Sequence, residues 1–322
     1  MMPHGYVSGD RGAHDERVAT AGYESWFVSA RDPGSLRALW IRHTRNRPAQ
    51  GPASAALWCT VAGGDPGGEP VVVKQVFGAF PADSAAGPEG FRGRATMGGR
   101  TVAWDLSVSG AQPPLRPLRP AMLYRAPLPR TKLEVAVPDG LVAGVLDVDG
   151  RQIGVSGWRG TIGHNWGAEH ADSWVWLHAD GFGTAPDAWL ELVLARIRIG
   201  RARSPWTAMG ALCFGGERLP LGGLGRRPQV DARPGRLTAS VPSPGARLGL
   251  VVVTDDASAV AVPYADPRGG SRVVRHAVLA RVELTLRRRD GTGRTLSSDR
   301  GAYEYGGRHG IPGVGLRPLP EG

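Results

Sequence analysis

Apolar residues along this chain come in short runs that are separated by glycine, proline and Asp-Gly pairs. Within most runs apolar and polar positions alternate with period two, which is typical of strands with one buried face. Residues 187–199 come closest to a helical pattern, but the alternation from Arg196 to Ile199 favours a strand. The other runs that predict strands are residues 23–29, 38–43, 55–61, 71–77, 102–108, 132–137, 141–148, 152–155, 208–214, 237–241, 247–253, 258–262 and 273–287. We therefore expect an all-β protein with little helix.

Turn residues mark where these strands should end. Asp-Gly pairs at 139–140 and 149–150 predict turns, and Gly63–Gly68 predicts a hairpin. The proline-rich residues 112–130 indicate an extended connector. The segments that predict loops are residues 78–90 and 215–236.

Two parts of the chain resemble each other at an offset of 148 residues. Glu24-Ser25-Trp26-Phe27-Val28 aligns with Asp172-Ser173-Trp174-Val175-Trp176. Two later pairs keep the same order: Ala38-Leu39-Trp40 with Ala188-Trp189-Leu190, and Ala56-Leu57-Trp58-Cys59 with Ala211-Leu212-Cys213. The register drifts by several residues, so chance similarity is the alternative. A duplication predicts two similar all-β units.

The repeat and the turns predict four parts of the chain. They are a polar N-terminal tail at residues 1–20, an N-terminal β-domain at 21–156, a C-terminal β-domain at 157–310 and a tail at 311–322.

The composition supports a folded, turn-rich protein. The chain has 322 residues, enough for a large core, and contains 48 Gly and 27 Pro. Such a content approaches that of low-complexity chains, but ten Trp argue against disorder, because disordered chains lack large aromatic residues.

The net charge of +10 would suit a polyanion binder. The basic residues are dispersed, however: 37 of the 39 are arginine, and the densest run is Arg287-Arg288-Arg289. We therefore expect no specific nucleic-acid partner. Transient contact with an anionic membrane surface stays open, as does a merely solvated basic surface.

Several signals are missing from the sequence. The first 20 residues have no apolar core of a signal peptide, and no apolar run approaches the ~20 residues of a transmembrane helix. Cys59 and Cys213 form no CxxC pair, and no phosphate loop, GxGxxG, HExxH or GxSxG motif is present. We expect a cytoplasmic protein with no transmembrane segment, no metal and no cofactor.

The densest cluster of chemically useful residues runs from Gly163 to Asp180. In a strand, Trp174, Trp176, His178 and Asp180 share one face, and the small aliphatic residues between them share the other. The first face suits the inside of a ligand-holding barrel. A metal site at His164, His170 and His178 is a weaker interpretation, because they lack a clear carboxylate partner. A purely structural Trp-rich core is the plainer alternative.

This segment also carries a resemblance to a known family. His164-Asn165-Trp166-Gly167 followed by Trp174-Val175-Trp176 resembles the Asn-Trp-Gly and Trp-x-Trp signature of tocopherol cyclases. Residues 24–27 and 38–42 are similar to the start of the wider superfamily that includes carotenoid hydratases (hydroxyneurosporene synthases). Gly163-His164 stands where an acidic and a basic residue are expected in the cyclases.

The resemblance implies two consecutive lipocalin-like antiparallel β-barrel or sandwich domains and an apolar, isoprenoid-like ligand. In the enzymatic members it implies proton-initiated cyclisation or hydration of a carbon–carbon double bond. That chemistry needs a dry acid and aromatic faces for a carbocation. On this interpretation His164 or His178 donates the proton, oriented by Asp180 or Glu24. The residues expected to hold the ligand are Asn165, Trp166, Trp174, Trp176, Trp26 and Trp40.

Two functions fit such a cavity: a cyclase or hydratase, and a non-catalytic lipocalin-like lipid carrier. An ionisable group at the buried end of the cavity would distinguish them, because only the enzyme needs one. Glu304, between Tyr303 and Tyr305, can face either the lumen or solvent, and we expect it to face solvent.

Overall fold

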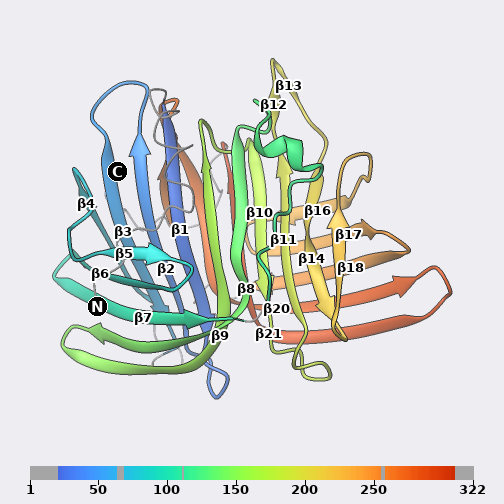
Figure 1. The fold of residues 1–322 in the computed structure, drawn as a ribbon, viewed down its shortest axis with the longest axis horizontal. Coiled ribbons are helices and arrows are strands. Elements are labelled where there is room, and N and C mark those ends of the chain that lie inside the picture. The colour runs from blue at the N-terminus through green and yellow to red at the C-terminus, as the bar shows by residue number, and fades with distance from the viewer. Residues whose placement is uncertain (1–20, 64–68, 111, 255–257, 309–322) are drawn as a thin grey trace.

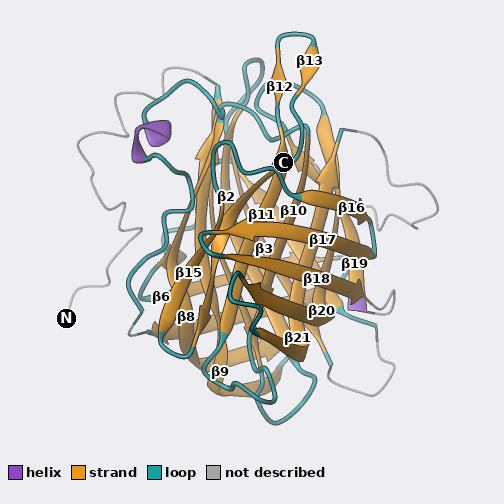
Figure 2. Cartoon of the chain, turned by 90° about the vertical axis from the view of Figure 1, so that its right-hand side faces the viewer, coloured by secondary structure: helices purple, strands orange, loops and turns teal. Residues whose placement is uncertain are grey.

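The chain folds into two large antiparallel β-sheets that lie next to each other (Figure 1). The structure, a computed structural model, describes residues 21–63, 69–110, 112–254 and 258–308. The described residues contain no α-helix, and η1 (Ala121–Tyr124) is a short 3₁₀ helix (Figure 2). The all-β prediction is confirmed.

The first sheet has the strand order β4-β3-β2-β1-β9-β8-β7-β6-β5. Its strands are β1 (Gly22–Arg31), β2 (Ala38–Arg47), β3 (Ser54–Ala62), β4 (Val71–Phe77), β5 (Ala85–Gly87), β6 (Gly90–Met97), β7 (Arg100–Ser109), β8 (Thr131–Val148) and β9 (Arg151–Gly167).

The second sheet has the order β15-β14-β11-β10-β21-β20-β18-β17-β16, and β19 pairs with β20 beside it. Its strands are β10 (Ser173–Ala179), β11 (Trp189–Arg196), β14 (Thr207–Phe214), β15 (Glu217–Gly222), β16 (Gln229–Arg233), β17 (Arg236–Ser243), β18 (Ala246–Thr254), β19 (Ala259–Ala265), β20 (Ser271–Arg288) and β21 (Gly293–Gly307). A separate hairpin pairs β12 (Arg198–Ile199) with β13 (Ala202–Arg203).

The two sheets have the same topology. If β10 is matched with β1, the nine strands along the second sheet follow the order of the first. This is the arrangement that a duplication predicts. The first sheet, however, extends to Gly167, so the chain passes to the second sheet between Gly167 and Ser173, later than the boundary expected after residue 156. The expected tails lie outside the described residues.

Some predicted turns and loops are strands. The Asp139-Gly140 pair lies within the continuous strand β8, where a register shift between Val137 and Gly140 replaces the expected reversal. The expected loops contain the short strands β5, β15 and β16, whose few apolar residues give a weak signal. Strand β6 was also missed. Most of the predicted hairpin at Gly63–Gly68 lies outside the described residues.

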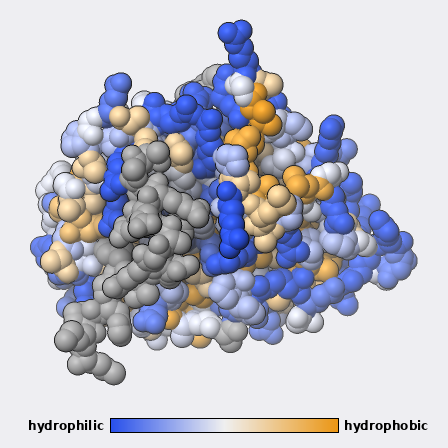
Figure 3. Space-filling model, turned by 45° about the horizontal axis from the view of Figure 1, so that its top comes forward, coloured by the Kyte–Doolittle hydropathy of each residue, from blue (hydrophilic) through white to orange (hydrophobic). Residues whose placement is uncertain are grey.

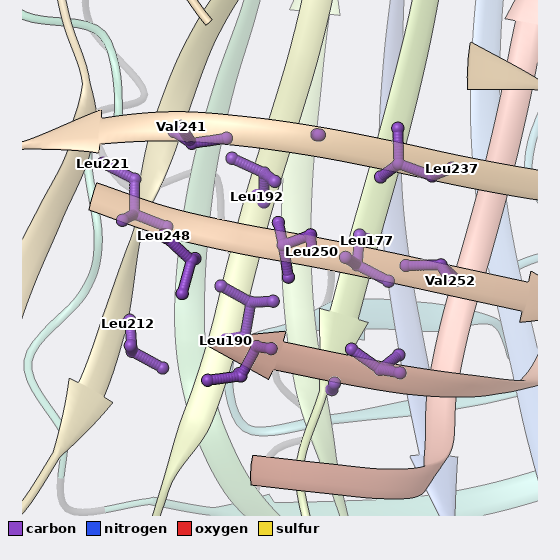
Figure 4. Close-up of a cluster of buried hydrophobic side chains, with 14 of the residues drawn as sticks. Leu177, Leu190, Leu192, Leu212, Leu221, Leu237, Val241, Leu248, Leu250 and Val252 are labelled. Atoms are coloured by element: carbon purple, nitrogen blue, oxygen red, sulfur yellow. The ribbon is translucent and has the colours of Figure 1, made fainter. Parts of the chain in front are cut away.

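Strand alternation places the buried apolar residues in three large clusters and a small fourth one. The first sheet encloses one core and the second sheet another, and a third cluster lies between the sheets. In the second sheet, leucine and valine side chains of β17 and β18 point at those of β10, β11 and β14, which cross beneath them (Figure 4). Each sheet therefore curves around its own apolar interior.

Leu192 tests the packing of this second core. It is fully buried on β11. Leu192→Ala should lower the free energy of unfolding by about 2–5 kcal/mol, because it leaves a cavity in a packed core. Leu36→Ala, the same change at an exposed turn, should alter it by less than about 0.5 kcal/mol. Urea unfolding of both variants measures the difference, and equal effects would contradict this account of the core.

Candidate ligand-binding site

A cavity of about 400 Å³ lies between the two sheets. The outward faces of β10, β11 and β14 form one wall, β1, β2 and β9 contribute another, and the proline-rich connector lies along it. Its aromatic lining residues are Tyr23, Phe27, Trp40, Trp174, Trp176 and Tyr264. The tryptophan face of β10 therefore faces the other sheet, which corrects the expectation that it lines the inside of a barrel.

Backbone register places Trp174 in this wall. Trp174 on β10 is directly opposite Gly306 on β21, and a Cβ atom at Gly306 would overlap the Trp174 ring. The glycine therefore lets the indole lie flat against β21. In that position Trp174 Nε1 donates a hydrogen bond to Glu304 Oε1 at 2.6 Å.

Glu304 is the acidic group of the cavity. Its side chain lines the cavity although the residue is only 8% exposed, so the expectation that it faces solvent is wrong. The second carboxyl oxygen, Oε2, accepts a hydrogen bond of 2.7 Å from the Tyr264 hydroxyl. The carboxyl group is thus held by two aromatic donors within a mainly apolar wall.

Tyr264 connects Glu304 to a buried cation. The Arg42 guanidinium lies 4.0 Å from the centre of the Tyr264 ring, within the range of a cation–π interaction. Burial raises the pKa of Tyr264 well above 10, so the phenol is neutral at physiological pH. Arg42 also donates a hydrogen bond of 2.5 Å from Nε to Ser25 Oγ, which fixes its orientation.

His170 and Asn165 are among the other polar side chains that line the cavity. His170 Nε2 lies 3.2 Å from the backbone oxygen of Ala265, and burial, with the neighbouring Arg42 charge, lowers the pKa of His170 to about 3. It is a neutral imidazole, and therefore a poor acid. The Oδ1 atom of Asn165 is buried and accepts no hydrogen bond from the described residues. An acceptor in this position suits the polar group of a ligand.

The predicted site residues fall into three places. Trp40, Trp174, Trp176 and Asn165 line the cavity. His178 and Asp180 share the face of Trp176, as the alternation predicts, but lie behind it and do not line the cavity. The remaining predicted residues, Glu24, Trp26, His164 and Trp166, lie on the opposite face of β1 and β9.

His178 belongs to a fully buried ionic network. Its Nδ1 lies 3.0 Å from Glu191 Oε2 and its Nε2 lies 3.3 Å from Asp180 Oδ2. Trp176 Nε1 donates to the other Glu191 oxygen at 2.5 Å, and the Arg31 guanidinium is 3.7 Å from Asp180. The network joins β1 of the first sheet to β10 and β11 of the second.

His164 lies in an aromatic stack on the first sheet. Its ring is 4.0 Å from that of Trp26 and 4.6 Å from that of Trp166, and Nε2 is 3.0 Å from Glu24 Oε1. Trp26 packs toward the core of the first sheet, whereas Trp174, its partner in the repeat, packs between the sheets. An odd shift of register flips a side chain to the other face, so the sequence alignment paired residues of opposite orientation.

Comparisons with known proteins support the fold. No family model matches the chain. Uncharacterized proteins of Mycobacterium tuberculosis strains CDC 1551 / Oshkosh and H37Rv are each 29% identical to it over 316 residues, 92% of both chains. Among solved structures, a candidate ATTH from Nitrosomonas europaea has a TM-score of 0.52 at 16% identity and covers 96% of this chain and 99% of its own.

Kievitone hydratase from Nectria haematococca has a TM-score of 0.50 at 9% identity, over 87% of this chain and 88% of its own. At these identities the likeness shows the fold, and a hydratase is among the proteins that share it.

No helix in the described part of the chain has the length and apolar character needed to cross a membrane.

The ionic network predicts a pH-dependent stability. Burial by itself disfavours a charged imidazole, but the hydrogen bonds that the ring donates to Asp180 and Glu191 outweigh it and raise the pKa of His178 above 6.5. A group whose pKa is raised on folding contributes stability that is fully present below its unfolded-state pKa. This contribution is lost as pH rises through its folded-state pKa. The pKa values of His43, His170 and His276 are lowered to about 3, so these residues affect stability only below about pH 6.5.

We expect the unfolding free energy, measured with urea from about pH 7 to pH 8, to fall as pH rises, because the three histidines with lowered pKa values are neutral in both states over this interval. His178→Gln should lower stability by about 3–5 kcal/mol near pH 6, because it leaves the buried Asp180 and Glu191 carboxylates with Arg31 as the one remaining cation of the network, and it should remove the decline. His164→Gln should retain the decline. A wild-type stability that is constant or rises over this interval would contradict a charged His178.

Proposed function

We propose that this chain binds an elongated apolar molecule, of isoprenoid, polyene or other lipid-like character, between its two sheets and hydrates a carbon–carbon double bond in it. The observation that carries the proposal is the Glu304–Tyr264 pair, an ionisable group buried in an aromatic cavity. A carrier needs no such group, whereas acid-initiated addition of water does. The fold shared with kievitone hydratase supports hydration rather than cyclisation.

The pair can transfer a proton in two linked movements. When Glu304 is protonated, its hydroxyl donates to the Tyr264 oxygen across the 2.7 Å contact, and the Tyr264 proton turns toward the cavity. Tyr264 then gives its proton to one alkene carbon and receives the Glu304 proton, which leaves a carbocation and a Glu304 carboxylate. The Arg42 charge over the Tyr264 ring stabilises negative charge that develops on the phenol oxygen.

Addition of water completes the cycle. The oxygen of a water molecule bonds to the carbocation, and the proton that it loses returns to Glu304, so the acid is regenerated and the product is an alcohol. Before water adds, the faces of Trp40, Trp174 and Trp176 stabilise the cation by about 0.5–2 kcal/mol each without reacting with it. Asn165 orients the polar group of the ligand. Cyclisation uses the same groups when a hydroxyl of the ligand replaces the water.

The first experiment is mass spectrometry of an organic extract of the purified protein, followed by incubation with a panel of prenylated phenols, squalene and acyclic polyenes in heavy water. We expect a product that has gained one water molecule and carries one deuterium on carbon. Recovery of a bound but unchanged lipid would support the carrier instead. Repeated absence of any apolar ligand would contradict both functions.

Glu304→Gln should lower the rate of hydration by about 100-fold or more, because a positioned acid–base group contributes about that factor, while ligand binding persists. Tyr264→Phe should have a similar effect. Glu283→Gln, the same change at an exposed position on β20, should retain the activity. Full activity of Glu304→Gln would overturn the proposed acid, and a matching loss in Glu283→Gln would mean that the effect is not specific.

A further inference from the structure

The cavity reaches the surface among exposed apolar side chains. Ile199, on the β12–β13 hairpin, is 54% exposed, and Leu224, in the loop after β15, is 68% exposed, yet both line the cavity. Residues that line a cavity and are also exposed mark its mouth. Met122 on η1, beside the lining residue Leu123, is 69% exposed. Exposed apolar side chains of two segments thus lie at the entrance, and Met122 is exposed on a third segment, next to a lining residue.

The same three segments are rich in arginine and lack acidic residues. We call residues 117–129, 197–206 and 222–228 the rim. It contains seven arginines and no Asp or Glu: Arg119, Arg125, Arg198, Arg201, Arg203, Arg226 and Arg227. Arg198 and Arg203 lie 3.7 Å and 2.6 Å from the buried Asp172. The other five are exposed and form no ion pair with the described residues.

The rim occupies one end of the molecule. The β12–β13 hairpin and η1 both lie at the top of Figures 1 and 2. Figure 3 shows apolar surface gathered there, beneath a hydrophilic projection. The chain has 29 acidic residues, and none of them lies in the 30 residues of the rim. The entrance therefore combines a positive field with exposed apolar side chains.

We propose that the rim docks on an anionic lipid bilayer, so that an apolar ligand passes from the membrane into the cavity without crossing water. Exposed apolar side chains enter the interface between headgroups and acyl chains, and arginines bind the anionic headgroups. Large apolar patches on a protein surface mark such contacts. This inference rests on the proposed function for its purpose, but vesicle binding is measured without any substrate or turnover.

The test is sedimentation of the full chain with vesicles of phosphatidylcholine alone and of phosphatidylcholine mixed with phosphatidylglycerol. We expect binding only to the mixed vesicles, weakened by added salt. The variant R119Q/R201Q/R226Q should bind about 100-fold more weakly, because each basic residue near an anionic surface contributes about fivefold. The control R94Q/R151Q/R294Q removes the same charge at exposed positions on β6, β9 and β21, away from the rim, and should bind like the wild type.

A second set of variants tests the apolar contribution. M122S/I199S/L224S should weaken binding to mixed vesicles, whereas L141S/V145S/V253S, which removes exposed apolar side chains elsewhere, should not. Circular dichroism confirms that each variant is folded. Absence of binding to mixed vesicles, equal losses in the rim and control arginine variants, or tighter binding of the rim to duplex DNA than to vesicles would each overturn the proposal. Hydration that fails while the vesicle results hold would overturn only the proposed function.

Discussion

Strand β10 has to bury both of its faces, and much of the structure follows from this constraint. Val175, Leu177 and Ala179 point into the core of the second sheet, so Trp174, Trp176 and His178 point the other way. The first sheet covers that second face. Indole and imidazole groups that leave water need hydrogen-bond partners, and carboxylates of neighbouring strands provide them.

The carboxylates between the sheets differ in what they can reach. Glu191 and Asp180 are closed in by His178, Arg31 and Trp176, a set in which two potential cations face two anions. Such a network holds the sheets in register and has no access to a ligand. Glu304 accepts two hydrogen bonds in a similar way, but the cavity lies on its open side. Access, rather than the type of residue, therefore separates a structural carboxylate from a candidate catalytic one.

The sequence predicted the local features well. Period-two alternation identified most strands, and it placed Trp174 and Trp176 on one face because that inference needs only neighbouring residues. It could not show what covers the face, since the cover is the first sheet, which begins about 150 residues earlier in the chain. Tyr264, Arg42 and Glu304 were missed as site residues for the same reason: Trp174 and Glu304 are 130 residues apart, and neither lies near a motif that names the other.

The central claim is that an apolar ligand binds between the sheets rather than inside either of them. Crystals of the protein grown with a bromine-labelled prenylated phenol test it most directly, through the anomalous scattering of the bromine. The account predicts a bromine peak in the cavity bounded by Trp40, Trp174 and Trp176, with the ligand in contact with the Glu304–Tyr264 pair. A peak among the leucine side chains within either sheet, or on the outer surface alone, would contradict it.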